Sequence, residues 1–179
     1  PGLMAAGLPY WDLNSYLKDR FGQRVQKITL DAGLTCPNRD GRVSTGGCLY
    51  CNARGSGTGA WGRGQDIPAQ LEAGMARLSR RYGAARFIAY FQSFSNTYAT
   101  WTTLRELYEA ALTPPQVVGL AVGTRPDCLE DEVLDLLAGC ARDRLVWLEI
   151  GLQSAHDATL SRLNRGHDAA CFREAALRA

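Results

Sequence analysis

The chain has 179 residues, of which 46% are hydrophobic and 21% are charged, and its formal net charge is +2. This length and composition predict one globular domain with a sizeable core, and they exclude a disordered or low-complexity chain. The near-neutral charge favours neither a protein that coats nucleic acid nor one that lies on a membrane surface. The sequence has no apolar run of about 18 residues, so it predicts no membrane span.

The first predicted element is an N-terminal amphipathic segment over residues 1–25, which we expect to cover a sheet formed by the rest of the chain. Residues 1–9 lack the basic and apolar regions of a secretory signal. Residues 26–179 show no linker composition and no internal repeat, so they are expected to form a single domain. The apolar and aromatic members of the first segment are Tyr10, Trp11, Leu13, Tyr16, Leu17 and Phe21.

Four short apolar runs alternate with helical patterns along residues 26–179. Such runs are typical of strands buried on both faces of a parallel sheet. Asp127 is the expected N-cap of one helix, and Ser154 is the expected cap of a short final helix that contains Leu160 and Leu163. The predicted strands are Lys27–Leu30, Arg86–Phe91, Val117–Val122 and Leu145–Leu152, and the longer helices are Ile67–Tyr82, Thr102–Leu112 and Cys128–Arg142.

This order predicts an α/β fold built from about four right-handed βα units. Four units are too few to close a barrel of ordinary size, so the sheet is either open and doubly wound or part of a larger barrel. Residues 168–179 have a helical pattern without a stop signal, and we therefore expect the chain to be truncated.

Three of the six cysteines are crowded into the long loop after the first predicted strand. Eleven residues separate Cys36 from Cys48, and two separate Cys48 from Cys51. A short C-x-x-C turn can direct both thiolates at one soft metal. Because the other three cysteines are scattered through helical patterns, metal ligands in a reduced cytoplasmic protein are favoured over a disulfide framework.

Three chemistries compete for this loop. A structural zinc site needs four ligands, and neither histidine lies near the cysteines in sequence. A thioredoxin-type redox pair would open a helix and would need no third cysteine. Three thiolates without a fourth fit a [4Fe–4S] cluster with one open iron, which the spacing favours over zinc without excluding it.

Several motifs resemble the radical S-adenosylmethionine (SAM) superfamily, and in particular its branch that is similar to the elongator catalytic subunit and to bacterial proteins of the YhcC/YtqA type. The motifs are TCPNRDG (35–41), GGCLYCN (46–52), YFQSFSNTYA (90–99), GTRPDCL (123–129), LEIGLQS (148–154) and LNRGHD (163–168). The resemblance implies a partial (β/α)6 barrel, here truncated to about four βα units, with Cys36, Cys48 and Cys51 as cluster ligands and Tyr50 as the aromatic residue before the third cysteine.

The resemblance also implies which residues bind SAM. Gln92 and Ser93 stand where the family has a Gly-Gly-Glu motif, and Asn96 is a nearby candidate. Gln153 and Arg165, twelve residues apart, resemble a pair that contacts the sugar region and the carboxylate of SAM. Thr124 and Arg125 are expected to edge the same pocket. Glu149 sits in the middle of a strand among apolar residues, so it is expected to point into a barrel or pocket, and a functional role is favoured because a buried carboxylate is costly without a partner.

The implied activity is reductive cleavage of SAM to a 5′-deoxyadenosyl radical, which abstracts hydrogen from a substrate. This chemistry needs an external electron donor of the flavodoxin or ferredoxin type. Similarity to the elongator-like branch indicates tRNA as the substrate, through modification of a wobble-uridine side chain, with a small molecule as the close alternative. A zinc-binding structural or interaction module without SAM chemistry is the rival outside enzymes.

Overall fold

A single parallel sheet forms the centre of the protein, which the computed structural model describes over residues 10–179. The strands are β1 (Val25–Leu30), β2 (Arg86–Phe91), β3 (Val117–Thr124) and β4 (Leu145–Ile150). The helices are α1 (Leu13–Phe21), α2 (Ile67–Tyr82), α3 (Trp101–Leu112), α4 (Asp131–Ala141), α5 (Asp157–Arg162) and α6 (Ala169–Arg178), with short 3-10 turns at Trp61–Arg63 and Pro126–Cys128.

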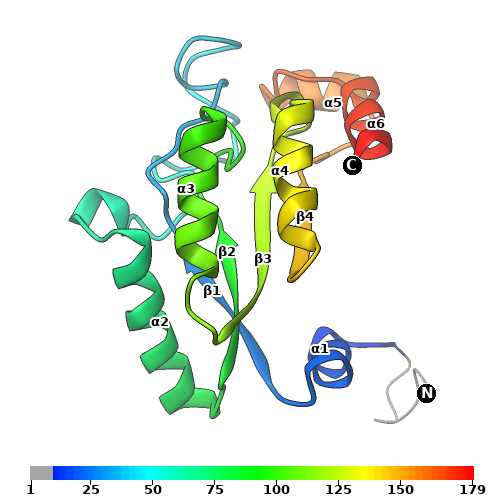
Figure 1. Cartoon of the computed structure of the whole chain (residues 1–179). Coiled ribbons are helices and arrows are strands. Elements are labelled where there is room, and N and C mark those ends of the chain that lie inside the picture. The colour runs from blue at the N-terminus through cyan, green and yellow to red at the C-terminus, as the bar shows by residue number, and fades with distance from the viewer. Residues whose placement is uncertain (1–9) are drawn as a thin grey trace.

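The strand order is β1-β2-β3-β4, so each strand pairs with its neighbour in sequence. Right-handed crossovers that advance in one direction place every connecting helix on the same face of a sheet. Figure 1 shows α2, α3 and α4 side by side on one face. The predicted α/β fold of four βα units is therefore confirmed, and the unreversed order identifies it as part of a barrel rather than a doubly wound sheet.

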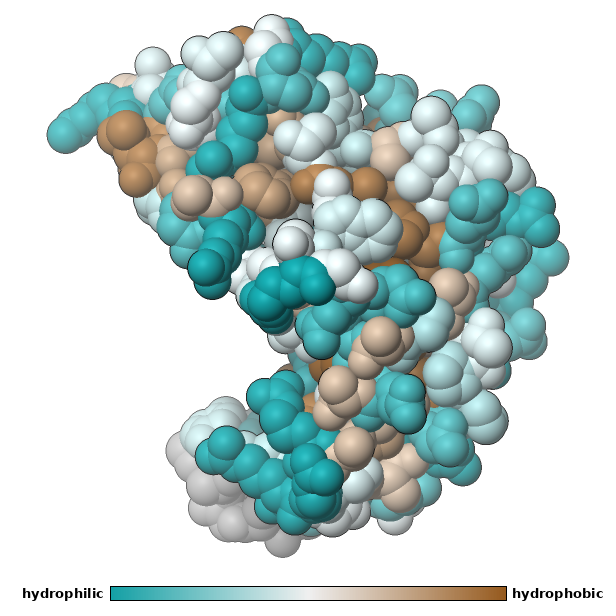
Figure 2. Space-filling model, turned by 90° about the vertical axis from the view of Figure 1, so that its left-hand side faces the viewer, coloured by the Kyte–Doolittle hydropathy of each residue, from teal (hydrophilic) through white to brown (hydrophobic). Residues whose placement is uncertain are grey.

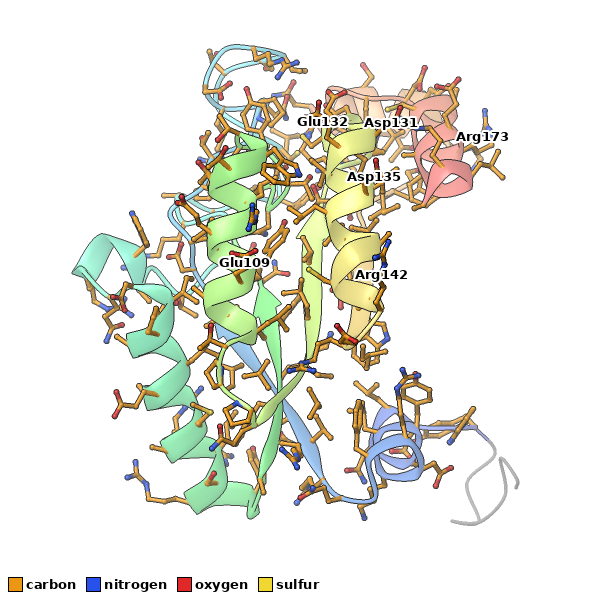
Figure 3. All side chains as sticks on the ribbon, in the orientation of Figure 1. Glu109, Asp131, Glu132, Asp135, Arg142 and Arg173 are labelled. Carbon is orange, nitrogen blue, oxygen red and sulfur yellow. The ribbon has the colours of Figure 1, made fainter. Side chains whose placement is uncertain are left out.

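Apolar side chains fill the space between this face and the helices. Leu30, Phe91 and Leu120 come from three successive strands, and they pack with Leu71 of α2 and Leu104 of α3. All five are fully buried. Burial of large apolar side chains is the main stabilising contribution to such a domain. Charged residues of α3, α4 and α6 point away from this core, as Figure 3 shows for Glu109, Asp131, Glu132, Asp135, Arg142 and Arg173.

The opposite face of the sheet is hollowed, and Figure 2 shows the hollow in profile. Helix α1 covers its lower end, where Leu17 packs with Val25, Ile88 and Leu145. This helix belongs to the N-terminal segment predicted from the sequence, whose residues 1–9 lie outside the described residues. Between residues 10 and 179, every helix is too short or too polar to cross a membrane.

The predicted cap at Asp127 is wrong. Helix α4 begins at Asp131, and Glu130 occupies the N-cap position. The Asp127 carboxylate instead accepts hydrogen bonds from Nε and Nη2 of Arg125, at 2.9 and 2.7 Å. The Asp127 carboxylate therefore pairs with the buried guanidinium group of Arg125 instead of capping the helix, as the sequence pattern had indicated.

The cap predicted at Ser154 is also wrong. Helix α5 begins at Asp157 with His156 in the N-cap position, and the Ser154 hydroxyl accepts the backbone N–H of His156 at 3.1 Å. This contact closes a local turn before the helix. The preceding strand ends at Ile150, two residues earlier than the apolar pattern predicts.

Candidate functional site

A cavity of about 330 Å³ lies at the carboxyl ends of the strands. Loops that follow all four strands contribute to its lining, as expected where parallel strands end at one edge of a sheet. Ten of the twelve candidate residues line it: Cys36, Cys48, Tyr50, Cys51, Gln92, Thr124, Arg125, Glu149, Gln153 and Arg165.

The three cysteines of the long loop open onto this one cavity. The thiols of Cys36 and Cys48 are buried, whereas that of Cys51 is half-buried. Within residues 10–179, no three side chains of the usual ligand types lie close enough together to hold a single metal ion. A [4Fe–4S] cluster is larger than one ion, because its cysteines bind different irons around the cluster.

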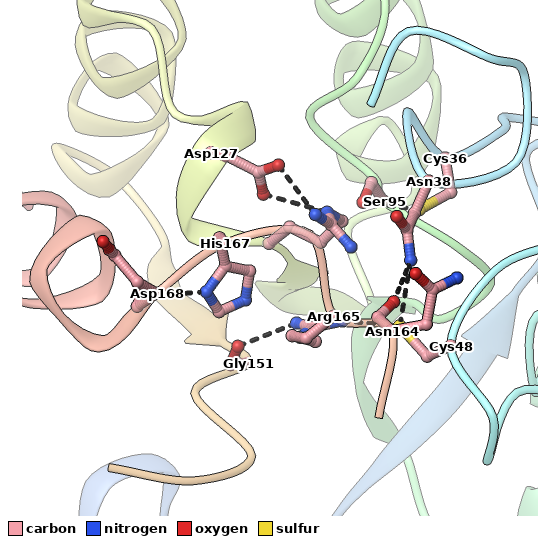
Figure 4. Close-up of polar contacts among 11 residues, drawn as sticks. Cys36, Asn38, Cys48, Ser95, Asp127, Gly151, Asn164, Arg165, His167 and Asp168 are labelled. Atoms are coloured by element: carbon pink, nitrogen blue, oxygen red, sulfur yellow. Dashed lines mark hydrogen bonds and ion pairs between the residues drawn. The ribbon is translucent and has the colours of Figure 1, made fainter. Parts of the chain in front are cut away.

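Two nitrogen donors approach the sulfur of Cys48. Nη1 of Arg165 and Nδ2 of Asn38 each lie 3.5 Å from this sulfur (Figure 4). Burial by itself raises the pKa of the Cys48 thiol, but hydrogen bonds from Arg165, Tyr50 and Asn38 lower it below its ordinary value. Such donors stabilise a thiolate, which is the form of cysteine that binds metals.

The backbone of the loop depends on two tight features. Gly47 has a φ of +78°, and a Cβ there would lie 2.7 Å from Nε of Arg39. Nη2 of Arg39 donates in turn to the carbonyls of Cys51 and Asn52, at 3.1 and 2.7 Å. Only glycine fits this left-handed, crowded position without strain, so the GG sequence before Cys48 serves the close wrapping of the loop.

Gln153 and Arg165 lie beside the cysteines, as the sequence predicts. Nη2 of Arg165 donates to the carbonyl of Gly151 at 2.7 Å, and a Cβ on that glycine would lie 2.7 Å from the same nitrogen. Nε of Arg165 is buried without a hydrogen-bond partner in the described part of the chain. Because Arg165 lines the cavity, its guanidinium group is suited to binding an anion there.

Left-handed backbone conformations of residues other than glycine gather at this site. Among residues 10–179 they are Ser56, Phe94, Gln153 and Asn164, with φ between 51° and 69°. The first three line the cavity. Such conformations are costly outside glycine and are concentrated at functional sites.

Arg125 is 2% exposed and is held by its ion pair with Asp127. Burial alone lowers the pKa of this guanidinium, but the Asp127 carboxylate raises it well above its ordinary value. Nη1 of Arg125 has no partner among the residues that the structure describes. The cavity therefore holds two cationic side chains, Arg125 and Arg165, each with one unused nitrogen.

Glu149 points into the hollow and lines the cavity, as predicted, but both of its oxygens have partners. Lys27 Nζ lies 2.6 Å from one oxygen, and the Tyr90 hydroxyl donates to the other at 2.8 Å. The same hydroxyl also contacts the side-chain oxygen of Gln92. Burial raises the pKa of Glu149, but Lys27 and Tyr90 lower it below its ordinary value.

Two predicted SAM contacts do not line the cavity. The Ser93 hydroxyl is buried and donates to Asp31 at 3.0 Å. The Asn96 amide is buried and donates to the carbonyls of Phe91 and Gly123, at 3.1 and 2.9 Å. The chain turns both side chains away from the cavity. They bind the segment after β2 to the end of β1 and to β3 instead.

The sequence reasoning missed several residues at the site. Asn38 of the cysteine loop approaches the Cys48 sulfur, Asn164 contacts this loop from outside, and Lys27 and Tyr90 hold Glu149. The sequence shows the motifs that contain Asn38 and Asn164, but it does not show that these two asparagines contact each other's segment. For Lys27 the available signal was a single cation inside an apolar strand pattern.

Known proteins resemble this chain along most of its length. The family model described as the radical SAM superfamily matches residues 38–179. The uncharacterised protein YtqA of Bacillus subtilis is 44% identical over 165 residues, which are 92% of this chain and 51% of that protein. Protein YhcC of Escherichia coli is 48% identical over 157 residues, which are 87% and 50% of the two chains. This chain thus spans about half the length of the curated relatives it matches.

A solved structure has the same fold. It is the archaeal Elp3 of Methanocaldococcus infernus with an N-terminal deletion, which aligns with a TM-score of 0.57 and 14% identity over 84% of this chain and 34% of that one. The match of the family model begins just after Cys36 and includes the other two cysteines and the strands β2, β3 and β4. Since that match covers well over half of the sequence, the chain belongs to the radical SAM superfamily.

Proposed function

We propose that Cys36, Cys48 and Cys51 bind a [4Fe–4S] cluster and that the adjoining cavity binds SAM. The observation that carries the proposal is that all three cysteines line one cavity, which is also lined by two arginines. Three cysteines leave one iron of the cluster without a protein ligand. The chemistry supplied by the bound cluster and SAM is one-electron cleavage of the sulfonium C–S bond, which gives methionine and a 5′-deoxyadenosyl radical.

The residues of the chain bind and orient these groups. Arg165 and Asn38 donate toward the Cys48 sulfur, and the Ser95 hydroxyl lies 3.9 Å from the Cys36 sulfur. The guanidinium group of Arg165, which lines the cavity together with Gln153, would bind the carboxylate of SAM. Thr124, Gln92, Tyr50 and Glu149 also line the cavity.

An external one-electron donor of the flavodoxin or ferredoxin type completes the proposal. Cys51 is less buried than Cys36 and Cys48, so its side of the loop is the most open of the three toward such a donor. The tRNA substrate, the small-molecule alternative and the cytoplasmic location stay predictions from the sequence.

Reductive SAM cleavage tests this proposal. The anaerobically reconstituted protein is incubated with SAM and dithionite, and 5′-deoxyadenosine and methionine are measured by liquid chromatography. We expect both products from the parent and from Cys140→Ala, since Cys140 lies on α4 and does not line the cavity, and neither product from Cys48→Ala. A protein that holds iron and sulfide but yields no 5′-deoxyadenosine would contradict the SAM assignment, and one that holds zinc without sulfide would support the zinc module instead.

A further inference from the structure

A second turn of the chain lies against the cysteine loop. It consists of residues 163–166, between α5 and α6, and we call it the LNRG turn. Its Leu163 carbonyl accepts the backbone N–H of Leu49 at 3.1 Å. This bond joins the turn after α5 to the loop after β1, at the residue next to Cys48.

Two asparagines make this contact reciprocal. Nδ2 of Asn38, in the cysteine loop, donates to the Asn164 carbonyl at 2.5 Å. Nδ2 of Asn164, in the LNRG turn, donates to the Gly47 carbonyl at 2.8 Å and approaches the Ser44 hydroxyl at 3.4 Å. Each asparagine thus satisfies a backbone carbonyl of the other segment, across more than a hundred residues of sequence. Figure 4 shows the bond from Asn38 to Asn164.

The same side chains surround the sulfur of Cys48. Asn38 Nδ2 lies 3.5 Å from this sulfur, and Arg165, the residue after Asn164, places Nη1 at 3.5 Å. Asn38 is 0% exposed and Cys48 is 6% exposed. The position of this thiol therefore depends directly on how the LNRG turn sits against the loop.

The backbone of the LNRG turn is shaped for this close approach. Asn164 has a φ of +51°, a region that asparagine tolerates better than most residues. Gly166 has a φ of +75°, and a Cβ there would lie 2.6 Å from Val43 and 2.7 Å from Oδ1 of Asn38. A larger residue at 166 would push the turn away from the cysteine loop.

We propose that the LNRG turn clamps the cysteine loop and fixes Cys48 in its ligand position before the cluster binds, with Asn38 and Asn164 as positioning residues. The inference rests on the proposed function for the identity of the bound group, but the clamp itself is a property of the protein without a cluster. Because Asn164 and Arg165 are adjacent, this one turn determines the positions of both Cys48 and the arginine proposed to bind an anion.

The test removes one half of the clamp without straining the backbone. In Asn164→Gly, glycine adopts the left-handed conformation readily and only the amide side chain is lost. Hydrogen–deuterium exchange of the cluster-free protein is followed in the peptides that contain Gly47 and Leu49. We expect exchange there to accelerate about tenfold, the order expected when opening loses two neutral hydrogen bonds, while exchange in α2 stays unchanged.

The controls separate the clamp from general stability and from the proposed function. Asn14→Gly makes the same substitution in α1, at the other end of the sheet. It should leave the hydrogen–deuterium exchange of the cysteine loop unchanged. Asn164→Asp retains the size and the left-handed preference but replaces the amide donor by a carboxylate, so it should also accelerate exchange and serves if the glycine variant does not fold. Reconstitution should then give less bound iron in both Asn164 variants than in the parent.

Unchanged exchange at Gly47 and Leu49 in the folded Asn164 variants would overturn the inference, as would acceleration spread equally over α2. If the parent binds no iron–sulfur cluster, the proposed function fails, whereas the exchange result still decides whether the clamp exists.

Discussion

The two faces of the sheet in this protein carry opposite chemistry. In β1, Ile28 points toward the helices and is 1% exposed, whereas Lys27 points into the hollow. The same alternation places Phe91 among the helices and Tyr90 in the hollow. The helix-covered face is a dry apolar core, and the hollow face carries charged and aromatic groups that are bonded to one another.

This difference separates stability from chemistry. Apolar side chains on the helix face contribute burial and packing, so their loss should weaken the fold strongly. On the hollow face, Glu149 is bonded to both Lys27 and Tyr90. These polar groups therefore have hydrogen-bond partners although they are partly open to solvent, and keeping them there costs the fold little stability. Substitutions on the two faces should therefore differ in size and in pH dependence.

The largest effect is expected at Phe91. Phe91→Ala removes a ring that is 0% exposed and packs edge-on against Tyr108, with ring centroids 5.3 Å apart. We expect a loss of about 3–5 kcal/mol in the free energy of unfolding, because the cavity left behind cannot collapse fully. Urea denaturation measures it, with Leu177→Ala, an exposed position on α6, as the unchanged control. A loss below about 1 kcal/mol would contradict a tightly packed helix face.

A smaller effect is expected at Lys27. Its ion pair with Glu149 is partly open to solvent, with side-chain exposures of 28% and 40%. Lys27→Met should therefore destabilise the fold by no more than about 1 kcal/mol at pH 7. In the parent, Nζ of Lys27 lies 4.4 Å from the ring centroid of Tyr90 and 5.1 Å from that of Trp147. The methionine retains an apolar side chain over these two rings.

The pH dependence of that loss sharpens the comparison. The partners of Glu149 hold its folded-state pKa below the ordinary value of 4.5. A lowered carboxyl pKa stabilises the fold above the unfolded-state value, and this contribution is lost as the pH falls through the folded-state value. Denaturation of parent and variant should thus differ most near neutral pH, and the difference should shrink as the pH falls through the folded-state pKa of Glu149. A constant difference across this range would show that Lys27 stabilises by packing alone.

Regular structure followed from local pattern in this chain. The apolar runs predict all four strands, and the three long helices begin and end near their expected positions, because periodicity reports which side chains face the core. Asp127 was misassigned because an acidic residue before a helix is an ordinary capping signal, while its true partner, the buried Arg125, is a tertiary contact.

The site was only partly predictable for the same reason. Cysteine spacing and the family resemblance led to the residues that line the cavity, since both depend on sequence position. The directions of Ser93 and Asn96 depend on how the chain leaves β2, and the pairing of Asn38 with Asn164 depends on two loops meeting. Local patterns carry no information on such long-range contacts.

Iron and acid-labile sulfide analysis tests the central claim most directly. The anaerobically reconstituted parent is compared with Cys36→Ala, Cys48→Ala, Cys51→Ala and the control Cys140→Ala. We predict about four irons and four sulfides per chain for the parent and for Cys140→Ala, with a marked loss in each of the other three variants. Full iron and sulfide in all three, or one zinc per parent chain without sulfide, would contradict the account.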